Sequence, residues 1–165
     1  MRNRFIVFAA ACAALTAACS PEPEAPATPA APQGEVITAE RGGFIPEGVE
    51  YDQANGRFLT GSLAEGTIFT IERDGSVVPF VRDADLKSSI GIEADEPRDR
   101  LLVANSDSAV FGGGGTGQAK LGVYNLTTGE RLAMVDLAAV IGTPTAPSYF
   151  ANDVTVDGDR GEVRW

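Results

Sequence analysis

The chain has 165 residues, no histidine and a formal net charge of -10 at neutral pH. An acidic chain of this length is sufficient for one ordinary domain and is a poor candidate for binding nucleic acid. Without histidine it can form no Ser-His-Asp triad, no Cys-His pair and no His-based zinc site, so a bound metal would need oxygen ligands, which suit calcium, magnesium and manganese.

The first 18 residues have the layout of an export signal. Arg2 and Arg4 precede an apolar run that is too short to span a bilayer comfortably, and the run ends at Cys19. The residues before Cys19 resemble a bacterial lipobox, although Leu15 lies one place earlier than the Leu of that motif. We therefore predict a lipoprotein-type signal peptide over residues 1–18 and lipid attachment at Cys19. The alternative is an ordinary secretory signal that is cleaved nearby.

Both alternatives predict an exported protein. With the lipid, the protein would lie on the periplasmic face of the bacterial envelope and touch the membrane through the lipid alone; without it, the protein would be secreted. Residues 19–34 are rich in Pro and Ala and show no apolar periodicity, which predicts a disordered, extended tether. The folded domain is expected over residues 35–165.

Strands dominate this domain. Residues 67–81 consist of two β-rich runs on either side of an Asp-Gly pair at 74–75, which is a hairpin signal, and residues 120–137 repeat the arrangement around Thr-Gly at 128–129. No long run keeps a helical period. Residues 133–142 could include a helical turn, but the pattern favours the end of a strand followed by a loop. The sequence therefore predicts an all-β domain.

A pattern of apolar alternation, Asp and polar turn recurs along the chain. The first two copies begin 43 residues apart, the length of a four-stranded propeller blade. Loop-like insertions at 111–120 and 142–150 lengthen the interval to the third copy. Stacking such sheets around an axis buries faces that one sheet alone leaves exposed. The aligned positions are Gly48, Gly91 and Asp153, followed four residues later by Asp52, Asp95 and Asp157.

The stretches PEGVEYDQANGRFLTGS, GSVVPFV and FANDVTVDGDRGEV resemble the SMP-30/gluconolactonase/LRE-like family, whose relatives include strictosidine synthase-like proteins. The resemblance covers residues 43–165. It implies a six-bladed β-propeller, of which about two and a half blades are present, so the propeller is incomplete. Several family members are lactone hydrolases with one divalent metal in the central channel, held by a Glu and an Asn or Asp from different blades.

Two positions match the family's metal motif, and the resemblance implies that Glu47 and Asn152 are metal ligands. Glu47, Ile90 and Asn152 each lie one place before the aligned Gly or Asp, where a propeller strand faces the channel. Calcium is the metal expected first, with manganese, magnesium or zinc as alternatives. From the residues alone, the alternative interpretation is that Glu47 is an exposed residue at the start of a strand and that Asn152 is a turn residue.

The resemblance predicts a fragment of a metal-dependent lactonase or esterase that acts on a small-molecule lactone or ester. The general base is expected on later blades. Because the sequence stops inside the third repeat, we expect a truncated chain that is inactive alone. The alternative is a non-catalytic envelope propeller that binds a small ligand or a protein partner. The glycine run at 112–117 lacks the Lys and hydroxyl of a phosphate loop, and DGDRGE at 157–162 aligns with turns.

Overall fold

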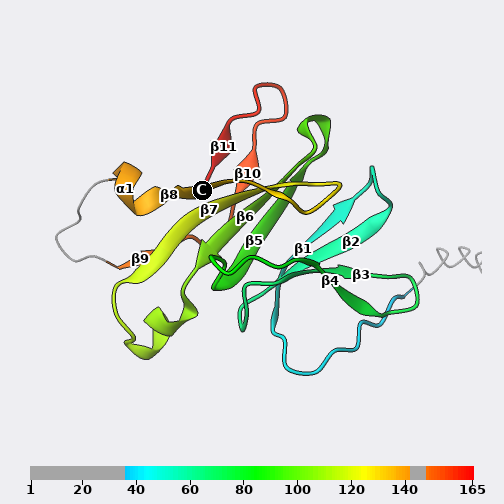
Figure 1. Ribbon diagram of the computed structural model, residues 1–165, viewed down its shortest axis with the longest axis horizontal. Helices are drawn as coiled ribbons and strands as arrows, with labels where there is room; N and C mark the ends of the chain where they lie inside the picture. The colour runs from blue at the N-terminus through cyan, green and yellow to red at the C-terminus, as the bar shows by residue number, and fades with distance from the viewer. Residues whose placement is uncertain (1–35, 142–147) are drawn as a thin grey trace, which may run out of the picture. The chain divides into compact units, whose positions relative to one another are not determined.

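The computed structural model describes residues 36–141 and 148–165 (Figure 1). These residues form an all-β domain that carries one short α-helix, α1 (Leu137–Ile141), and two short 3-10 segments. The fold class predicted from the sequence is confirmed at this level. The predicted signal peptide (residues 1–18), the tether (19–34) and Cys19 lie outside the described residues.

The first four strands pair antiparallel in chain order, and we call them the first meander. The hairpin predicted at Asp74-Gly75 is confirmed: Asp74 accepts hydrogen bonds from the backbone and the hydroxyl of Ser76, and Gly75 has a left-handed φ of 86°. The strands of the first meander are β1 (Pro46–Asp52), β2 (Arg57–Ser62), β3 (Ile68–Ile71) and β4 (Val77–Val81).

The next four strands repeat this arrangement, and we call them the second meander. The turn predicted at Thr128-Gly129 is confirmed, with a φ of 76° at Gly129. Helix α1 follows directly on the last strand, so the segment after the strand is a helical turn and not the loop that the sequence favoured. The strands of the second meander are β5 (Ser88–Asp95), β6 (Arg100–Ser106), β7 (Gly117–Asn125) and β8 (Arg131–Asp136).

The two predicted insertions contain more strand than their composition suggests. Strand β7 begins at Gly117, inside the stretch read as a loop, because β9 (Tyr149–Phe150) pairs parallel with it. The third copy of the repeat follows as a small hairpin of β10 (Thr155–Val156) and β11 (Val163–Arg164), which we call the third hairpin.

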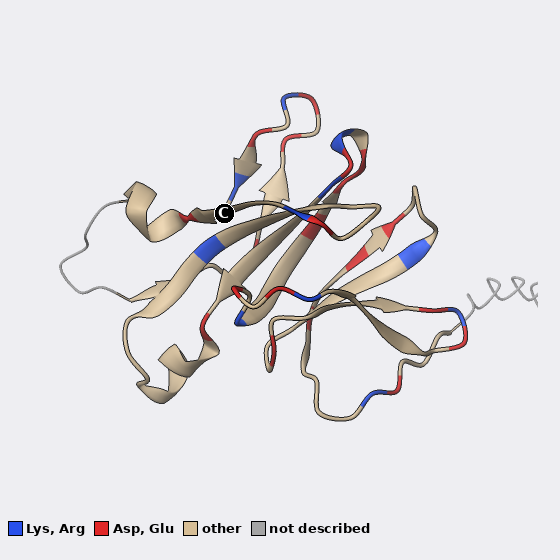
Figure 2. Cartoon of the chain, viewed as in Figure 1, with Lys and Arg blue, Asp and Glu red and all other residues tan. Residues whose placement is uncertain are grey.

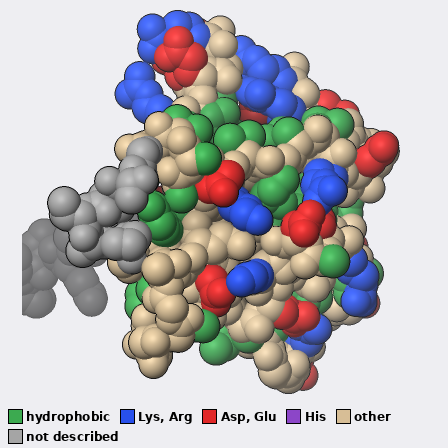
Figure 3. Space-filling model, turned by 60° about the vertical axis from the view of Figure 1, so that its left-hand side comes forward, with side chains coloured by type: hydrophobic (Ala, Val, Ile, Leu, Met, Phe, Trp, Pro, Cys, Tyr) green, Lys and Arg blue, Asp and Glu red, His purple; other side chains and the backbone are tan. Residues whose placement is uncertain are grey.

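Both faces of the second meander are covered in part. One apolar cluster lies between the two meanders, and Leu59 and Leu101 belong to it. A second cluster lies between the second meander and the third hairpin, and it includes Leu102 and Val154. Leu101 and Leu102 are neighbours on β6, and they serve different clusters because successive side chains of a strand point to opposite faces. On the face displayed in Figure 3, acidic and basic side chains lie beside one another among the apolar ones.

Candidate functional site

The aligned positions of the repeat lie next to one another in space. A Cβ atom on Gly48 would lie 2.5 Å from the carbonyl oxygen of Ile90, and one on Gly91 would lie 2.6 Å from the Cα of Asp153. The backbone N–H of Gly91 donates to the carbonyl of Asn152 at 3.0 Å. The start of β1 therefore packs on β5, and β5 packs on the segment that leads into β10, through backbones that approach too closely for a side chain.

A second contact recurs at the far end of the repeat. Ser62, at the end of β2, pairs with Ser89 of β5, and this pair is the register contact between β2 and β5. Ser106, one residue beyond the position equivalent to Ser62 and also the last residue of its strand, donates its hydroxyl to the carbonyl of Ala151 at 2.7 Å and accepts the N–H of Ala151 at 2.8 Å. The end of the second strand therefore contacts the following unit in both cases, through a backbone pair in one and a side chain in the other.

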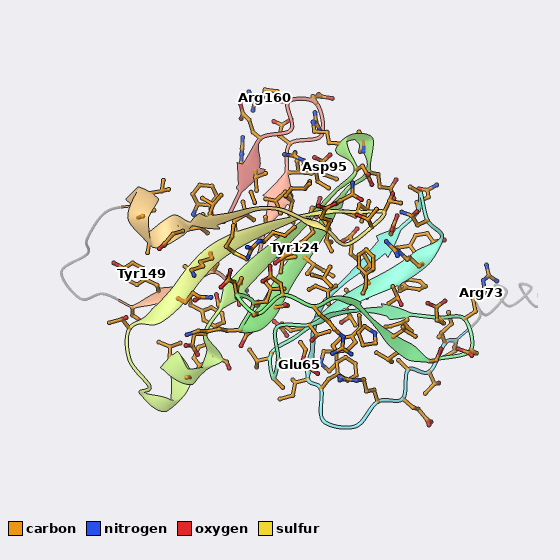
Figure 4. The ribbon with its side chains drawn as sticks, viewed as in Figure 1. Glu65, Arg73, Asp95, Tyr124, Tyr149 and Arg160 are labelled. Atoms are coloured by element: carbon orange, nitrogen blue, oxygen red, sulfur yellow. The ribbon has the colours of Figure 1, made fainter. Side chains whose placement is uncertain are left out.

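The repeated Asp residues are buried anchors in the two meanders. Asp52 is 0% exposed and accepts from Arg57 Nε at 2.9 Å; Asp95 is 1% exposed and accepts from Arg98 and Arg100 (Figure 4). The turns predicted from these stretches are confirmed, and the turns between β5 and β6 and between β10 and β11 carry charged residues (Figure 2). Their anchoring role was missed, although an Arg five residues after each Asp is a visible signal.

The same arginines reach into the following unit. A terminal amino group of Arg57 donates to the carbonyl of Leu126, in the turn between β7 and β8. Arg100 donates to the carbonyl of Gly161 at 3.2 Å, and Arg98 donates to that of Gly158 at 3.2 Å, both in the turn of the third hairpin. A buried carboxylate therefore orients a guanidinium that binds backbone oxygen of the next unit.

The three candidate positions do not have the same surroundings. Glu47 lies near the start of β1, opposite Gly61, and is exposed. Asn152 lies just before β10 and is also exposed. Ile90 is 1% exposed and belongs to the second apolar cluster. Ile90 is therefore covered by a cluster that includes Val154, at the entry to the third hairpin, whereas the other two side chains are open to solvent.

Glu47 and Asn152 could supply two oxygen ligands to a metal. Neither side chain hydrogen bonds to another residue in the described ranges, so their oxygens are available, and carboxylate and amide oxygens are ligands that calcium prefers. Within residues 36–141 and 148–165 no group of three His, Cys, Asp or Glu side chains is placed to hold a metal ion. The donor chemistry fits calcium, but these two residues would be only part of a coordination shell.

Two equivalent glutamates on the first strands of the two meanders have shifted pKa values that the sequence analysis did not identify. The pKa of Glu93 on β5 is raised, first by partial burial and then by repulsion from Glu50, Asp153 and Asp95. The pKa of Glu50 on β1 is raised by partial burial as well. Negative charge therefore accumulates along β1 and β5, where a cation would be attracted.

We expect the Glu93→Gln variant to unfold at higher urea concentration than the wild type at pH 7, because Gln removes a charge that burial and repulsion disfavour. A carboxyl whose pKa is raised by folding lowers the stability of the protein as the pH rises through its unfolded and folded pKa values. The difference in stability between the variant and the wild type should therefore disappear well below pH 4.5, where the carboxyl is protonated in both the folded and the unfolded state. Glu130→Gln, at an exposed turn, is the control. An equal advantage at both pH values would contradict this explanation.

Another polar cluster has a structural explanation. Tyr124 is 0% exposed and donates its hydroxyl to Asp83 at 2.9 Å, and Arg131 pairs with both Asp83 and Asp85. Burial and the neighbouring carboxylate raise the pKa of Tyr124 strongly, so it stays a neutral hydrogen-bond donor. The cluster ties the connection between the meanders to β7 and β8 (Figure 4).

Among the residues that the structure describes, no helix has the length and apolarity needed to cross a membrane. A scan against protein-family models and searches of curated proteins and of solved structures gave no match to the chain.

Proposed function

We propose that the chain forms part of a β-propeller of the lactone-hydrolase type, in which the two meanders and the third hairpin are successive blades. The proposal is supported chiefly by the repeated contacts between units: Gly48 packs on β5 as Gly91 packs on Asn152 and Asp153. Contacts at the end of the second strand, from Ser62 to Ser89 and from Ser106 to Ala151, support the same stacking. Units that meet at equivalent positions are what stacking around one axis requires.

In this proposal the site lies at the entrance of the innermost strands. Glu47 supplies a charged oxygen ligand and Asn152 a neutral one, from two different units. The cation they hold would polarise a lactone carbonyl and acidify a coordinated water, so that ring opening gives a hydroxy acid. The partly buried Glu50 and Glu93 add negative potential that favours cation binding.

Metal binding tests the proposal directly. Isothermal titration of the full chain with calcium and with manganese should detect one site, and Glu47→Gln should weaken binding at least about tenfold because a charged ligand becomes neutral. Glu130→Gln, on an exposed turn, is the matched control and should bind like the wild type. Equal affinity of the Glu47→Gln variant and the wild type would remove Glu47 from the site, and no detectable binding of any divalent cation would refute the proposed chemistry.

A second candidate is a non-catalytic envelope propeller that binds a small ligand or a protein partner. The observation that favours it is Ile90, a buried apolar residue at the position aligned with Glu47 and Asn152. An apolar residue there contributes no ligand to a metal. This candidate predicts no divalent cation site that depends on Glu47.

A further inference from the structure

One side of the first meander is exposed where the equivalent side of the second meander is buried. The cross-strand pair Tyr51 and Phe58 corresponds in register to Ala94 and Leu101 of the second meander. Tyr51 is 48% exposed and Phe58 is 37% exposed, whereas Leu101 is 0% exposed and Ala94 packs against the first apolar cluster.

The neighbouring position on the inner strand gives the same contrast. Val49 is 67% exposed, whereas its equivalents Ile92 and Val154 are each 5% exposed. The third hairpin also follows the buried pattern, because its pair Val156 and Val163 packs against the second apolar cluster. Of the three units, only the first leaves this side open over the described residues, and its aromatic rings are in contact with each other, with centroids 4.8 Å apart.

The internal repeat also indicates what kind of surface covers this side. In each interface within the chain, one unit contributes the buried pair and the preceding unit covers it. The covering unit does so with a residue of its own second strand, the one directly after the position equivalent to the second member of the buried pair. These residues are Leu59 and Leu102, both 0% exposed, and they pack in the first and second clusters respectively. The equivalent residue of the third hairpin is Arg164, which is exposed and pairs with Thr155 as Leu59 pairs with Glu50.

Arg164 and the aromatic pair are chemically complementary. A guanidinium on an aromatic face is favourable, and this chain already uses that contact: Arg41 lies 4.1 Å from the ring centroid of Phe69, and Arg57 lies 4.0 Å from that of Phe80. Arg164 forms no ion pair with another residue in the described part of the chain. The third hairpin thus has an arginine at the position where the covering units within the chain have a leucine. The first meander has two aromatic residues at the positions of the buried pair.

We propose that the exposed side of β1 and β2, formed by Val49, Tyr51 and Phe58, is an interface for a second copy of this chain, whose Arg164 packs on Tyr51 and Phe58. The contact is head-to-tail, since the two copies contribute different surfaces. It uses the geometry of the repeat and requires neither the metal nor the lactone chemistry proposed above, so metal titration and mass measurement test separate statements.

Sedimentation velocity of the full chain in a mild detergent tests the interface, at high salt to screen repulsion between two acidic chains. The weight-average mass should rise with protein concentration above the 17.2 kDa of one chain. Tyr51→Ser and Arg164→Glu should each weaken self-association at least about tenfold, because each removes one half of a desolvated cation–aromatic contact. Leu132→Ser, at an apolar position on β8 that is 54% exposed, is the matched control and should associate like the wild type.

Mixing the two variants gives the sharpest result. Each retains one intact surface, so an equimolar mixture of Tyr51→Ser and Arg164→Glu chains should form a one-to-one dimer that neither forms alone. That dimer also shows that both variants are folded. A wild type that stays monomeric at every concentration overturns the proposal. So does association that neither variant weakens, which would come from another surface or the apolar N-terminal run, and so does a mixture that stays monomeric, which would indicate a two-fold interface.

Discussion

Replacing Asp95 with Asn should lower the free energy of unfolding by about 3 kcal/mol. The Asp95 carboxylate is 1% exposed and pairs with Arg98 at 3.0 Å and with Arg100, whose Nε lies 2.9 Å away. Asn keeps the shape but removes the charge, so two guanidinium groups lose their partner where solvent reaches them only in part. The cost falls at the low end of values for broken buried pairs because the arginines are 31% and 25% exposed.

Urea denaturation followed by circular dichroism measures this loss, and the repeat supplies the control. Asp157 occupies the equivalent position in the third hairpin and pairs with Arg160 at 2.7 Å, but the two side chains are 27% and 59% exposed. Asp157→Asn should therefore cost less than about 1 kcal/mol. If the two substitutions cost the same, burial would not be what distinguishes the two copies.

Replacing Gly48 with Ala should destabilise the protein by about 3 kcal/mol, which combines the strain of a left-handed residue with an overpacked contact. Gly48 has a φ of 66°, and an added Cβ would lie 2.5 Å from the carbonyl oxygen of Ile90. Backbone atoms of β5 cannot turn aside as a flexible side chain could. The first and second meanders would have to separate where their inner strands meet.

Gly56→Ala separates the two contributions. Gly56 has nearly the same φ, 65°, but nothing lies within 4 Å of an added Cβ. It should cost only about 1 kcal/mol, the strain of the left-handed conformation. The same urea titration compares the variants. Equal losses at Gly48 and Gly56 would mean that the packing of β1 on β5 contributes nothing.

Local features of the fold were accessible from the sequence. The Asp-Gly pair at 74–75 and the Thr-Gly pair at 128–129 predicted two turns that the structure contains, because such residues favour turn geometry whatever surrounds them. The spacing of Gly48 and Gly91 predicted equivalent positions, and these positions do adjoin one another.

Features that depend on distant partners were not accessible. The strand at Gly117 forms because Tyr149 and Phe150 pair with it, and no local signal announces that pairing. Ile90 is buried because the third hairpin covers it, so alignment with Glu47 gave its position in the repeat but not its surroundings. The metal ligands remain a prediction, because a coordination shell is set by side chains from several units and not by any one motif.

The contacts between units have a consequence for how this protein can diverge. Arg57 and Arg100 bind carbonyl oxygens of Leu126 and Gly161, and Gly91 binds that of Asn152. A carbonyl is present at every residue, so the receiving segment can change almost all of its side chains without losing the bond. Selection would then preserve a few glycines, aspartates and arginines while the other residues change. This accounts for a repeat that can be recognised in the sequence at only a few positions.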